Sequence, residues 1–405
     1  MSATELPDDR PAGLRRGEPA YKRAATAMLI AGLAVFATMY ATQAMLPVLT
    51  GELNISPTTA ALTVSATTGA VALFIVPTSI LSEKLGRSPV LIACALGATL
   101  LGLILPLAPN AEWLIALRFV QGIIAAGVPA VAMAWLSEEL HQDDLGRAMG
   151  LYVAGTTVGG LSGRLLPAGL LEVTDWRPAL FALTALTFVG AIVMTILLPK
   201  QRRFRPKRIS FSSEARAVLS HWRHPHLAAL FSIAFVGMGV FVSVYNFIGF
   251  RMIDAFDLSP GLVGLVFLMY LSGTWSSARA GALSDKYGRG LIMSAGAVFM
   301  WCGLWLLAIP NLVLTLVGLL IFTASFFAMH STASGRIGVI ATQHRAEASS
   351  MYLMCYYLGS SVIGGIAGLV FTAFHWPGFI TTAAVVLLVV VGTAIALQVQ
   401  RSPGH

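Results

Sequence analysis

Long, uninterrupted apolar runs limit this chain to one kind of fold. Hydrophobic residues make up 57% of its 405 residues and charged residues only 11%, far from the composition of a soluble domain. A helix of about 20 apolar residues is long enough to cross the hydrocarbon core of a bilayer. Barrel strands would be about half as long and would alternate polar with apolar residues. The chain is therefore predicted to be an all-α membrane protein.

We expect twelve membrane-spanning helices, six on each side of a polar segment at 200–224. Their approximate limits are 24–49, 58–81, 88–107, 111–135, 146–171 and 177–199, then 225–250, 260–283, 290–308, 311–334, 346–373 and 376–399. This pattern predicts two six-helix bundles, at 24–199 and 225–399, joined by a basic linker. Within the linker, Phe211, Ala215, Val218, Leu219 and Trp222 recur at helical spacing, which fits either a short interfacial helix or a loose connection.

Basic residues predict the orientation in the membrane. Most of the 26 Lys and Arg residues fall in the termini, the central segment and every second loop, and only Arg177 and Arg251 fall in loops on the opposite side. Because Lys-rich and Arg-rich loops stay in the cytoplasm, both termini are expected to be cytoplasmic in a bacterial inner membrane. Residues 1–23 are expected to form a disordered tail and 400–405 a second tail. The net charge of +8 suits anionic lipid headgroups and does not indicate nucleic-acid binding.

Neither a cofactor site nor an enzyme site is apparent. The three cysteines lie in separate predicted helices, and the spacing of His221, His224 and His226 does not place all three on one helical face. No phosphate-binding loop and no nucleophile with a base at motif spacing is found, which disfavours an enzyme or an ATP-driven pump. We therefore expect no cofactor and no metal.

The two halves of the sequence repeat one another. The segment Ser79–Arg87 returns about half a chain later as Gly281–Arg289, each copy between two apolar runs. Further matches follow in the same order: Gly32, Val35, Phe36 and Tyr40 with Gly237, Val240, Phe241 and Tyr245; Ser56-Pro57 with Ser259-Pro260; and Tyr152 and Gly155 with Tyr356 and Gly359. Ordered matches of this kind indicate a duplicated six-helix unit. Two such parallel repeats are typical of one class of alternating-access transporter.

Over 24–399 the chain resembles the transporters of the major facilitator superfamily. The loop between helices two and three of that superfamily, and its repeat, follow the pattern G-x-x-x-D-[RK]-x-G-[RK]. The second copy fits fully, with Gly281, Asp285, Lys286, Gly288 and Arg289. The resemblance implies twelve transmembrane helices in two pseudo-symmetric bundles.

The first copy of the loop departs from the pattern. Ser79 takes the place of the glycine and Glu83 that of the aspartate, while Lys84, Gly86 and Arg87 agree with it. The resemblance implies that both loops latch the cytoplasmic gate in the outward-open state. The alternative for a single copy is a basic loop that only fixes the topology.

Two further segments resemble drug-efflux members of the superfamily, the acriflavine-sensitivity group. Arg118, Gln121 and Gly122 match the pattern R-x-x-Q-G. The antiporter pattern G-x-x-x-G-P-x-x-G-G is matched by Gly155, Gly159 and Gly163, with Gly160 in the proline place and Arg164 in the place of the last glycine. This resemblance implies proton-coupled antiport of small molecules and drug resistance. The alternative for the glycines is a purely structural role, in which small residues allow close helix packing.

Arg118 and Arg164 are the strongest candidates for a substrate site. An arginine inside a membrane helix costs about 2.5–3.5 kcal/mol on insertion scales and normally faces a cavity or a partner. Both are expected about 10 Å below the outer surface, although either can pack against a backbone end or snorkel outward. None of the 18 Asp and Glu residues lies in the middle of a predicted helix. We therefore expect a positive or neutral cavity for an anionic or amphipathic neutral substrate, with protons handled by an edge acid or by His330.

By the resemblance, the first and seventh helices line the central cavity. Further candidates to line it are Tyr40, Gln43, Gln121, Tyr245, Asn246, His330 and Tyr356. For His330 and Tyr356 the alternative is a hydrogen-bonded packing role. We expect a monomeric secondary transporter with a small-molecule substrate, protons and membrane lipid as partners. The alternatives are a uniporter or exchanger for a small organic anion, or a membrane sensor on the same scaffold.

Overall fold

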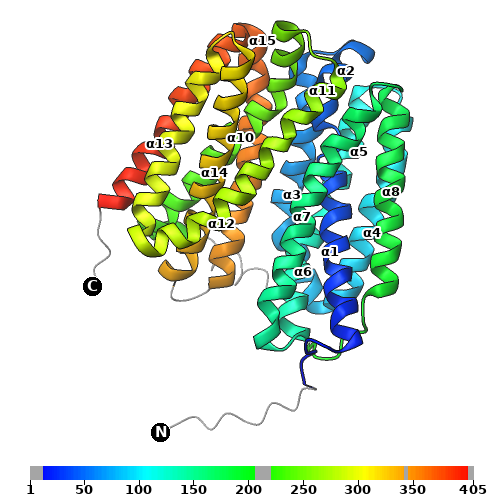
Figure 1. The fold of residues 1–405 in the computed structure, drawn as a ribbon. Helices are drawn as coiled ribbons and strands as arrows, with labels where there is room; N and C mark the ends of the chain where they lie inside the picture. Colours follow the sequence, from blue (N-terminus) through cyan, green and yellow to red (C-terminus); the bar gives the residue numbers. More distant parts are fainter. Residues whose placement is uncertain (1–11, 206–219, 342–344, 400–405) are drawn as a thin grey trace.

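The computed structural model describes residues 12–205, 220–341 and 345–399 (Figure 1). The first half contains α1 (Pro19–Met39), η1 (Gln43–Met45), α2 (Leu46–Glu52), α3 (Pro57–Leu85), α4 (Arg87–Ile104), η2 (Leu105–Leu107), α5 (Ala111–Ala125), α6 (Gly127–Glu139), α7 (Gln142–Leu170) and α8 (Trp176–Leu197). The second half contains η3 (His221–Arg223), α10 (Pro225–Phe256), α11 (Pro260–Leu265), η4 (Val266–Met269), α12 (Tyr270–Tyr287), α13 (Arg289–Ala308), α14 (Leu312–Ile340) and α15 (Arg345–Val399). The candidate linker residues 206–219 and the tails 1–11 and 400–405 lie outside the described residues.

The expected series of membrane helices is confirmed. Ten segments of the described residues are long and apolar enough to cross a membrane. The segment Glu347–Val399 contains two expected spans, because the chain turns at His375, whose φ of 53° and ψ of −167° are not helical (Figure 1). The more polar α7 corresponds to the remaining expected span.

Capping residues and glycines set many of the helix ends. Ser56, Asn110 and Asn311 each accept a hydrogen bond at 3.0–3.1 Å from the backbone N–H three residues further on, at the starts of α3, α5 and α14. Gly86 and Gly288 end α3 and α12 with φ values of 98° and 88°. Side chains rarely allow this conformation, so the two copies of the repeated loop depend on the same glycine turn.

The amino-terminal tail is shorter than the sequence predicts. α1 begins at Pro19, and Leu14, which is only 9% exposed, forms a parallel β-bridge with Leu140. The Tyr21 hydroxyl donates a hydrogen bond to the Asp144 carbonyl at 3.0 Å. The expectation of disorder up to residue 23 is therefore wrong for residues 12–23. An isolated leucine and tyrosine in a polar segment create no apolar run, so the sequence pattern hides this packing.

The helices form two bundles, α1–α8 and α10–α15, each built around an apolar core. α3 packs against α15, while η1 and α2 pack against α10. In Figure 1 the bundles meet at the end that carries α2 and α11 and diverge toward the opposite end, where α1 begins and α15 ends. We call these ends the far side and the termini side.

Glycines let α7 lie directly against α1. A Cβ on Gly155, Gly159 or Gly163 would collide with the backbone of α1, at successive turns of both helices. In the second bundle, the matching Gly359 lies against the backbone of Phe235 in the same way. Duplicated glycines therefore create the same close helix crossing in both bundles.

Candidate substrate site between the two bundles

Arg118 caps a break in the first membrane span. It is fully buried in α5, and its guanidinium donates hydrogen bonds to the carbonyls of Thr63 at 2.9 Å, Thr38 at 2.8 Å and Met39. Thr38 and Met39 are the last residues of α1, where carbonyls lack regular helical partners and the helix dipole places partial negative charge. Arg118 therefore stabilises the break between α1 and η1.

Gln121 completes this cap, one turn further along α5. Its side-chain oxygen accepts a hydrogen bond from Arg118 Nη1 at 2.6 Å, and its amide nitrogen donates to the Ala98 carbonyl at 2.9 Å. Among the described residues, no carboxylate forms an ion pair with Arg118. Carbonyl dipoles balance its charge instead, as in the alternative where a buried arginine packs against a backbone end.

Arg164 lies where the two bundles meet, and it is 2% exposed. Its guanidinium carbon is 4.0 Å from the ring centre of Tyr40, in the same bundle. The ring centres of Tyr270 and Phe267, in the other bundle, lie 4.6 and 5.4 Å away. Such cation–π contacts contribute about 2 kcal/mol in a desolvated site. No carboxylate among the residues of known placement pairs with Arg164, so the interface carries a positive charge balanced only by rings and neutral acceptors.

Gln43 connects Arg164 to the second bundle. Its Oε1 accepts a hydrogen bond from Arg164 Nε at 2.7 Å, and its Nε2 donates to Asn246 Oδ1 at 2.7 Å. Gln43 lies in η1, directly after the break that Arg118 caps, so the cap helps to position it. Tyr40, Gln43, Arg164 and Asn246 thus form one connected network, which we call the interface network. Its members come from α7, α10 and the broken first span.

Three further sequence candidates lie outside the interface network, in the second bundle. The hydroxyl of Tyr245 lies 2.6 Å from Thr323 Oγ1. His330 Nδ1 lies 3.0 Å from the Tyr352 hydroxyl, and its ring centre is 4.7 Å from that of Tyr356. These contacts fit the packing alternative for a histidine or tyrosine inside a bundle.

Glu172 forms a contact between the bundles at the far side. The Ser259 side chain and the N–H groups of Gly261 and Leu262 donate hydrogen bonds to its carboxylate, and the Gly261 bond measures 2.7 Å. These bonds favour the ionised form and hold the pKa of the Glu172 carboxyl below its ordinary value. The contact joins the turn after α7 to the start of α11.

The first copy of the repeated loop bonds within its own bundle, on the termini side. Arg87 bonds to Glu83 and, at 3.0 Å, to Glu138 at the end of α6, while Lys84 is exposed. Gly86 provides the turn between α3 and α4. The first loop is thus tied to α6.

The second copy makes fewer contacts. Asp285, Lys286, Gly288 and Arg289 are all exposed, and Arg289 donates a hydrogen bond to the Gly335 carbonyl of α14 at 3.4 Å. Among the described residues, neither loop bonds to the opposite bundle.

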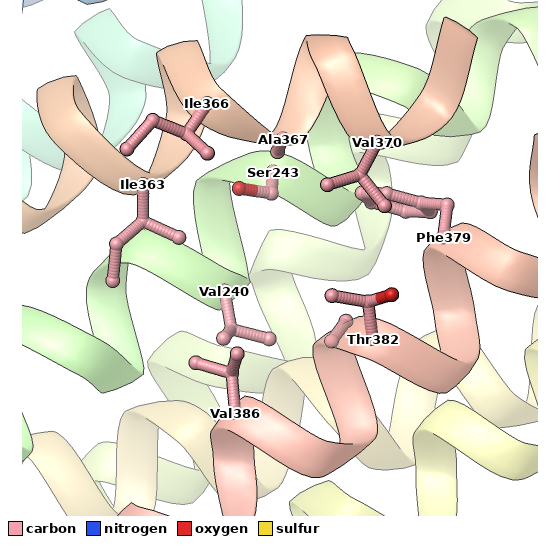
Figure 2. A pocket seen from close by; sticks show the side chains of 10 residues that line it. Val240, Ser243, Ile363, Ile366, Ala367, Val370, Phe379, Thr382 and Val386 are labelled. Atoms are coloured by element: carbon pink, nitrogen blue, oxygen red, sulfur yellow. The ribbon is translucent and has the colours of Figure 1, made fainter. Parts of the chain in front are cut away.

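A separate apolar cavity of about 80 Å³ lies between α10 and the two parts of α15 (Figure 2). Its only polar lining groups, the hydroxyls of Ser243 and Thr382, donate hydrogen bonds to the carbonyls of Gly239 and Gly378 in their own helices. Neither hydroxyl therefore has a hydrogen left to donate to a polar ligand. The interface network, and not this cavity, is the candidate substrate site.

Two of the three aromatic rings around Arg164 are missing from the sequence candidates. Phe267 and Tyr270 lie three residues apart, at the junction of η4 and α12. Aromatic residues at this spacing are common in membrane helices, so spacing alone does not mark them. Their contact with Arg164 can be recognised only in the folded structure, where the two bundles meet and both rings lie near its guanidinium.

Comparisons with known proteins agree with this architecture. A family model described as Major Facilitator Superfamily matches residues 28–337. The inner membrane transport protein YnfM of Escherichia coli (strain K12) is 36% identical over 389 residues, which are 96% of this chain and 93% of that protein. The uncharacterized MFS-type transporter YybF of Bacillus subtilis (strain 168) is 33% identical over 377 residues, 93% of each chain. The multi-drug resistance efflux pump PmrA of Streptococcus pneumoniae is 29% identical over only 44% of each chain.

Solved structures show the same fold. A bacterial homolog of the human lysosomal transporter Spinster, in an inward-facing and unoccupied conformation, superposes with a TM-score of 0.78 at 15% identity and covers 96% of this chain and 100% of its own. The nucleoside transporter NupG also gives 0.78 at 15% identity, with 94% and 100% covered. Such low identities show a shared fold and not a shared substrate. With its two helix bundles and the matching family model, this chain belongs to the major facilitator superfamily and is a multi-pass membrane transporter.

Proposed function

We propose that this chain exports small organic anions in exchange for protons, by rocking of its two bundles about the interface network. One observation carries the proposal: Arg164 lies at the interface, and no carboxylate among the described residues pairs with it. An organic cation 4 Å from this charge would be repelled by about 4 kcal/mol at a typical effective dielectric constant of 20. An anion would be attracted by a similar amount.

We place both termini and the basic loops in the cytoplasm, as the positive-inside rule predicts. The Glu172 contact and the bond between Gln43 and Asn246 then close the external side. The Spinster homolog, which has the same fold, is described as inward-facing, and in such a state substrate would enter from the cytoplasm. In the opposite state, Glu83 and Asp285 with their neighbouring basic residues would latch the cytoplasmic side.

Membrane energetics supports export by exchange. An anion that leaves the cell and a proton that enters it both move down an inside-negative potential. Each unit charge gains about 2.3 kcal/mol per 100 mV. The partial match to PmrA supports efflux, whereas the matches to YnfM and YybF support transport without a direction.

The test is efflux from proteoliposomes loaded with labelled organic sulfonates of graded size. Sulfonates stay ionised and do not leak through the bilayer as neutral acids. We expect an acidic external medium and an inside-negative potential to accelerate efflux severalfold, and an uncoupler to remove the contribution of the pH gradient. Efflux that requires external unlabelled anion and ignores the uncoupler would instead show anion exchange, which Arg164 also suits. If no sulfonate efflux depends on the protein, both proton-coupled export and anion exchange are contradicted.

A further inference from the structure

A pocket of about 430 Å³ lies on the termini side of the first bundle, where α3 ends, α4 begins and the chain leaves α8. The turn at Leu85 and Gly86 lines one side of this pocket, and the segment from Leu198 to Phe204 lines the other. Because the pocket lies at the ends of three membrane-spanning helices, it is at the level of the lipid headgroups. We call it the basic pocket.

Two basic side chains line this pocket without a partner from the protein. Lys200 and Arg202 are exposed, and their side chains form neither a hydrogen bond nor an ion pair with the residues that the structure describes. The nearby carboxylates are engaged elsewhere, since Glu138 pairs with Arg87 at 3.0 Å and Glu139 accepts the backbone N–H of Arg202 at 3.0 Å. The basic pocket therefore presents two positive charges that suit an anionic group.

Gln201 holds these two charges beside the start of α4. Its Oε1 accepts a hydrogen bond from the Ser88 N–H at 3.1 Å, and its Nε2 donates to Glu138 Oε2 at 3.2 Å. Lys200 and Arg202 flank Gln201 in the sequence, so both are carried to the amino-terminal end of α4. The helix dipole adds partial positive charge at this end.

An apolar groove of about 530 Å³ continues from the basic pocket toward the middle of the membrane. Leu85 and Pro89 line both spaces. From Leu85 the groove follows α3 past Leu81 to Phe74, over about 16 Å of the helix, and it reaches Ile124 of α5. Leu81 and Leu85 are 47% and 60% exposed, so the groove opens to the surrounding bilayer.

We propose that the basic pocket and the apolar groove together bind one anionic phospholipid of the membrane leaflet on the termini side. Its phosphate lies between Lys200 and Arg202, and one acyl chain lies in the groove along α3. Charge complementarity selects an anionic headgroup, and the continuity of the two spaces selects a headgroup that carries an acyl chain. The site is independent of the substrate that the bundles transport.

The charges are tested by native mass spectrometry of the purified full-length protein with equal amounts of dioleoyl phosphatidylglycerol and dioleoyl phosphatidylcholine. We expect the wild type to retain about tenfold more of the anionic lipid, and Lys200→Gln/Arg202→Gln to retain the two lipids within about twofold of one another. Lys22→Gln/Arg147→Gln is the matched control. It removes the same charges from exposed positions in α1 and α7 and should keep the preference of the wild type.

The groove is tested by filling it with a ring. Ala93→Phe changes an exposed residue that lines the groove, so the variant should fold. It should retain about fivefold less phosphatidylglycerol, because the ring displaces part of the acyl chain. Ala182→Phe, at an exposed position of α8 outside the groove, is the control and should retain as much as the wild type.

Three results would overturn the lipid site. Equal retention of the two lipids by the wild type, or an equal loss of preference in both charge variants, contradicts the role of the basic pocket. Unchanged retention by Ala93→Phe contradicts the role of the groove. Displacement of the bound lipid by glycerol phosphate, which has no acyl chain, would assign the basic pocket to a soluble phosphate ester instead.

Discussion

Two arginines of similar expected depth have different surroundings. Arg118 donates to backbone carbonyls at the end of α1, whereas Arg164 contacts aromatic rings of both bundles and the side chain of Gln43. The first arrangement stabilises the fold of one bundle. The second places a charge where the bundles meet. We therefore propose a positioning role for Arg118 and a binding role for Arg164.

Arg118→Ala should destabilise the protein more than an ordinary surface substitution. It leaves three backbone carbonyls and the Gln121 side chain without their charged donor, which should cost about 3 kcal/mol or more. The measurement is Tm in detergent. Arg23→Ala is the control, because Arg23 is exposed and, among the described residues, donates only to the Ile196 carbonyl, so a change within about 0.5 kcal/mol is expected. Equal Tm values for the two variants would contradict the capping role.

At this scale the sequence predicts which residues are unusual but not what each one does. A buried arginine is costly wherever it lies, so both Arg118 and Arg164 are identifiable from hydropathy alone. Their partners depend on where α1 breaks and on which face of α12 meets α7. Neither the position of this break nor the contacting face of α12 can be recognised as a pattern in a single sequence.

Among the elements, α7 has two glycine-containing faces with different roles. Gly155, Gly159 and Gly163 contact the backbone of α1, whereas a Cβ added to Gly160 would lie 3.3 Å from Arg164 Nη1. The helical spacing of the first three predicts close packing. The neighbouring Gly160 instead leaves room for the arginine, a distinction that the glycine pattern alone does not make.

Gly159→Ala should weaken the packing of α7 on α1. Its Cβ would collide with the backbone of Leu33, which is less able to shift than the end of a flexible side chain. Overpacking of this kind lowers the stability by about 1–3 kcal/mol. Gly169→Ala in the same helix is the control, because nothing lies within 4 Å of its Cβ position. Thermal unfolding of the two variants should show a lower Tm for Gly159→Ala only. A stable Gly159→Ala protein would show that the crossing is looser than described.

The contact between α7 and α11 should respond to acid through Glu172. Hydrogen bonds from Ser259, Gly261 and Leu262 lower the pKa of this carboxyl in the closed arrangement. The ionised form therefore favours closure above the ordinary carboxyl pKa of about 4.3, and the contribution is lost as pH falls through the lowered pKa. Acidification of the far side should thus separate the bundles there.

Spin labels at Gly51→Cys and Leu262→Cys, in a background without the native cysteines, can report this separation. Gly51 has open space at its Cβ position and Leu262 is 50% exposed, so both tolerate a label. The distance between the labels should lengthen on acidification in the wild type and stay constant with pH in Glu172→Gln. Equal pH responses in both proteins would assign the effect to another acid.

For the whole molecule, the duplicated sequence predicts two equivalent bundles, and the fold agrees. Gly86 and Gly288 form the same turn, and Gly155 and Gly359 the same helix crossing. The surroundings of Arg164 are not symmetric, because Arg164 and Tyr40 come from the first bundle and the rings of Tyr270 and Phe267 from the second. Repetition therefore predicts the scaffold, while the site arises from the differences between the copies.

The central claim is that Arg164 makes the transport pathway selective for anions. The most direct measurement compares initial efflux rates of labelled benzenesulfonate and benzyltrimethylammonium, which have similar shapes and opposite permanent charges, from proteoliposomes. We predict that the wild type moves the sulfonate at least tenfold faster and that Arg164→Gln loses most of this preference. Preference of the wild type for the cation, or a preference for the anion that persists in Arg164→Gln, would contradict the account.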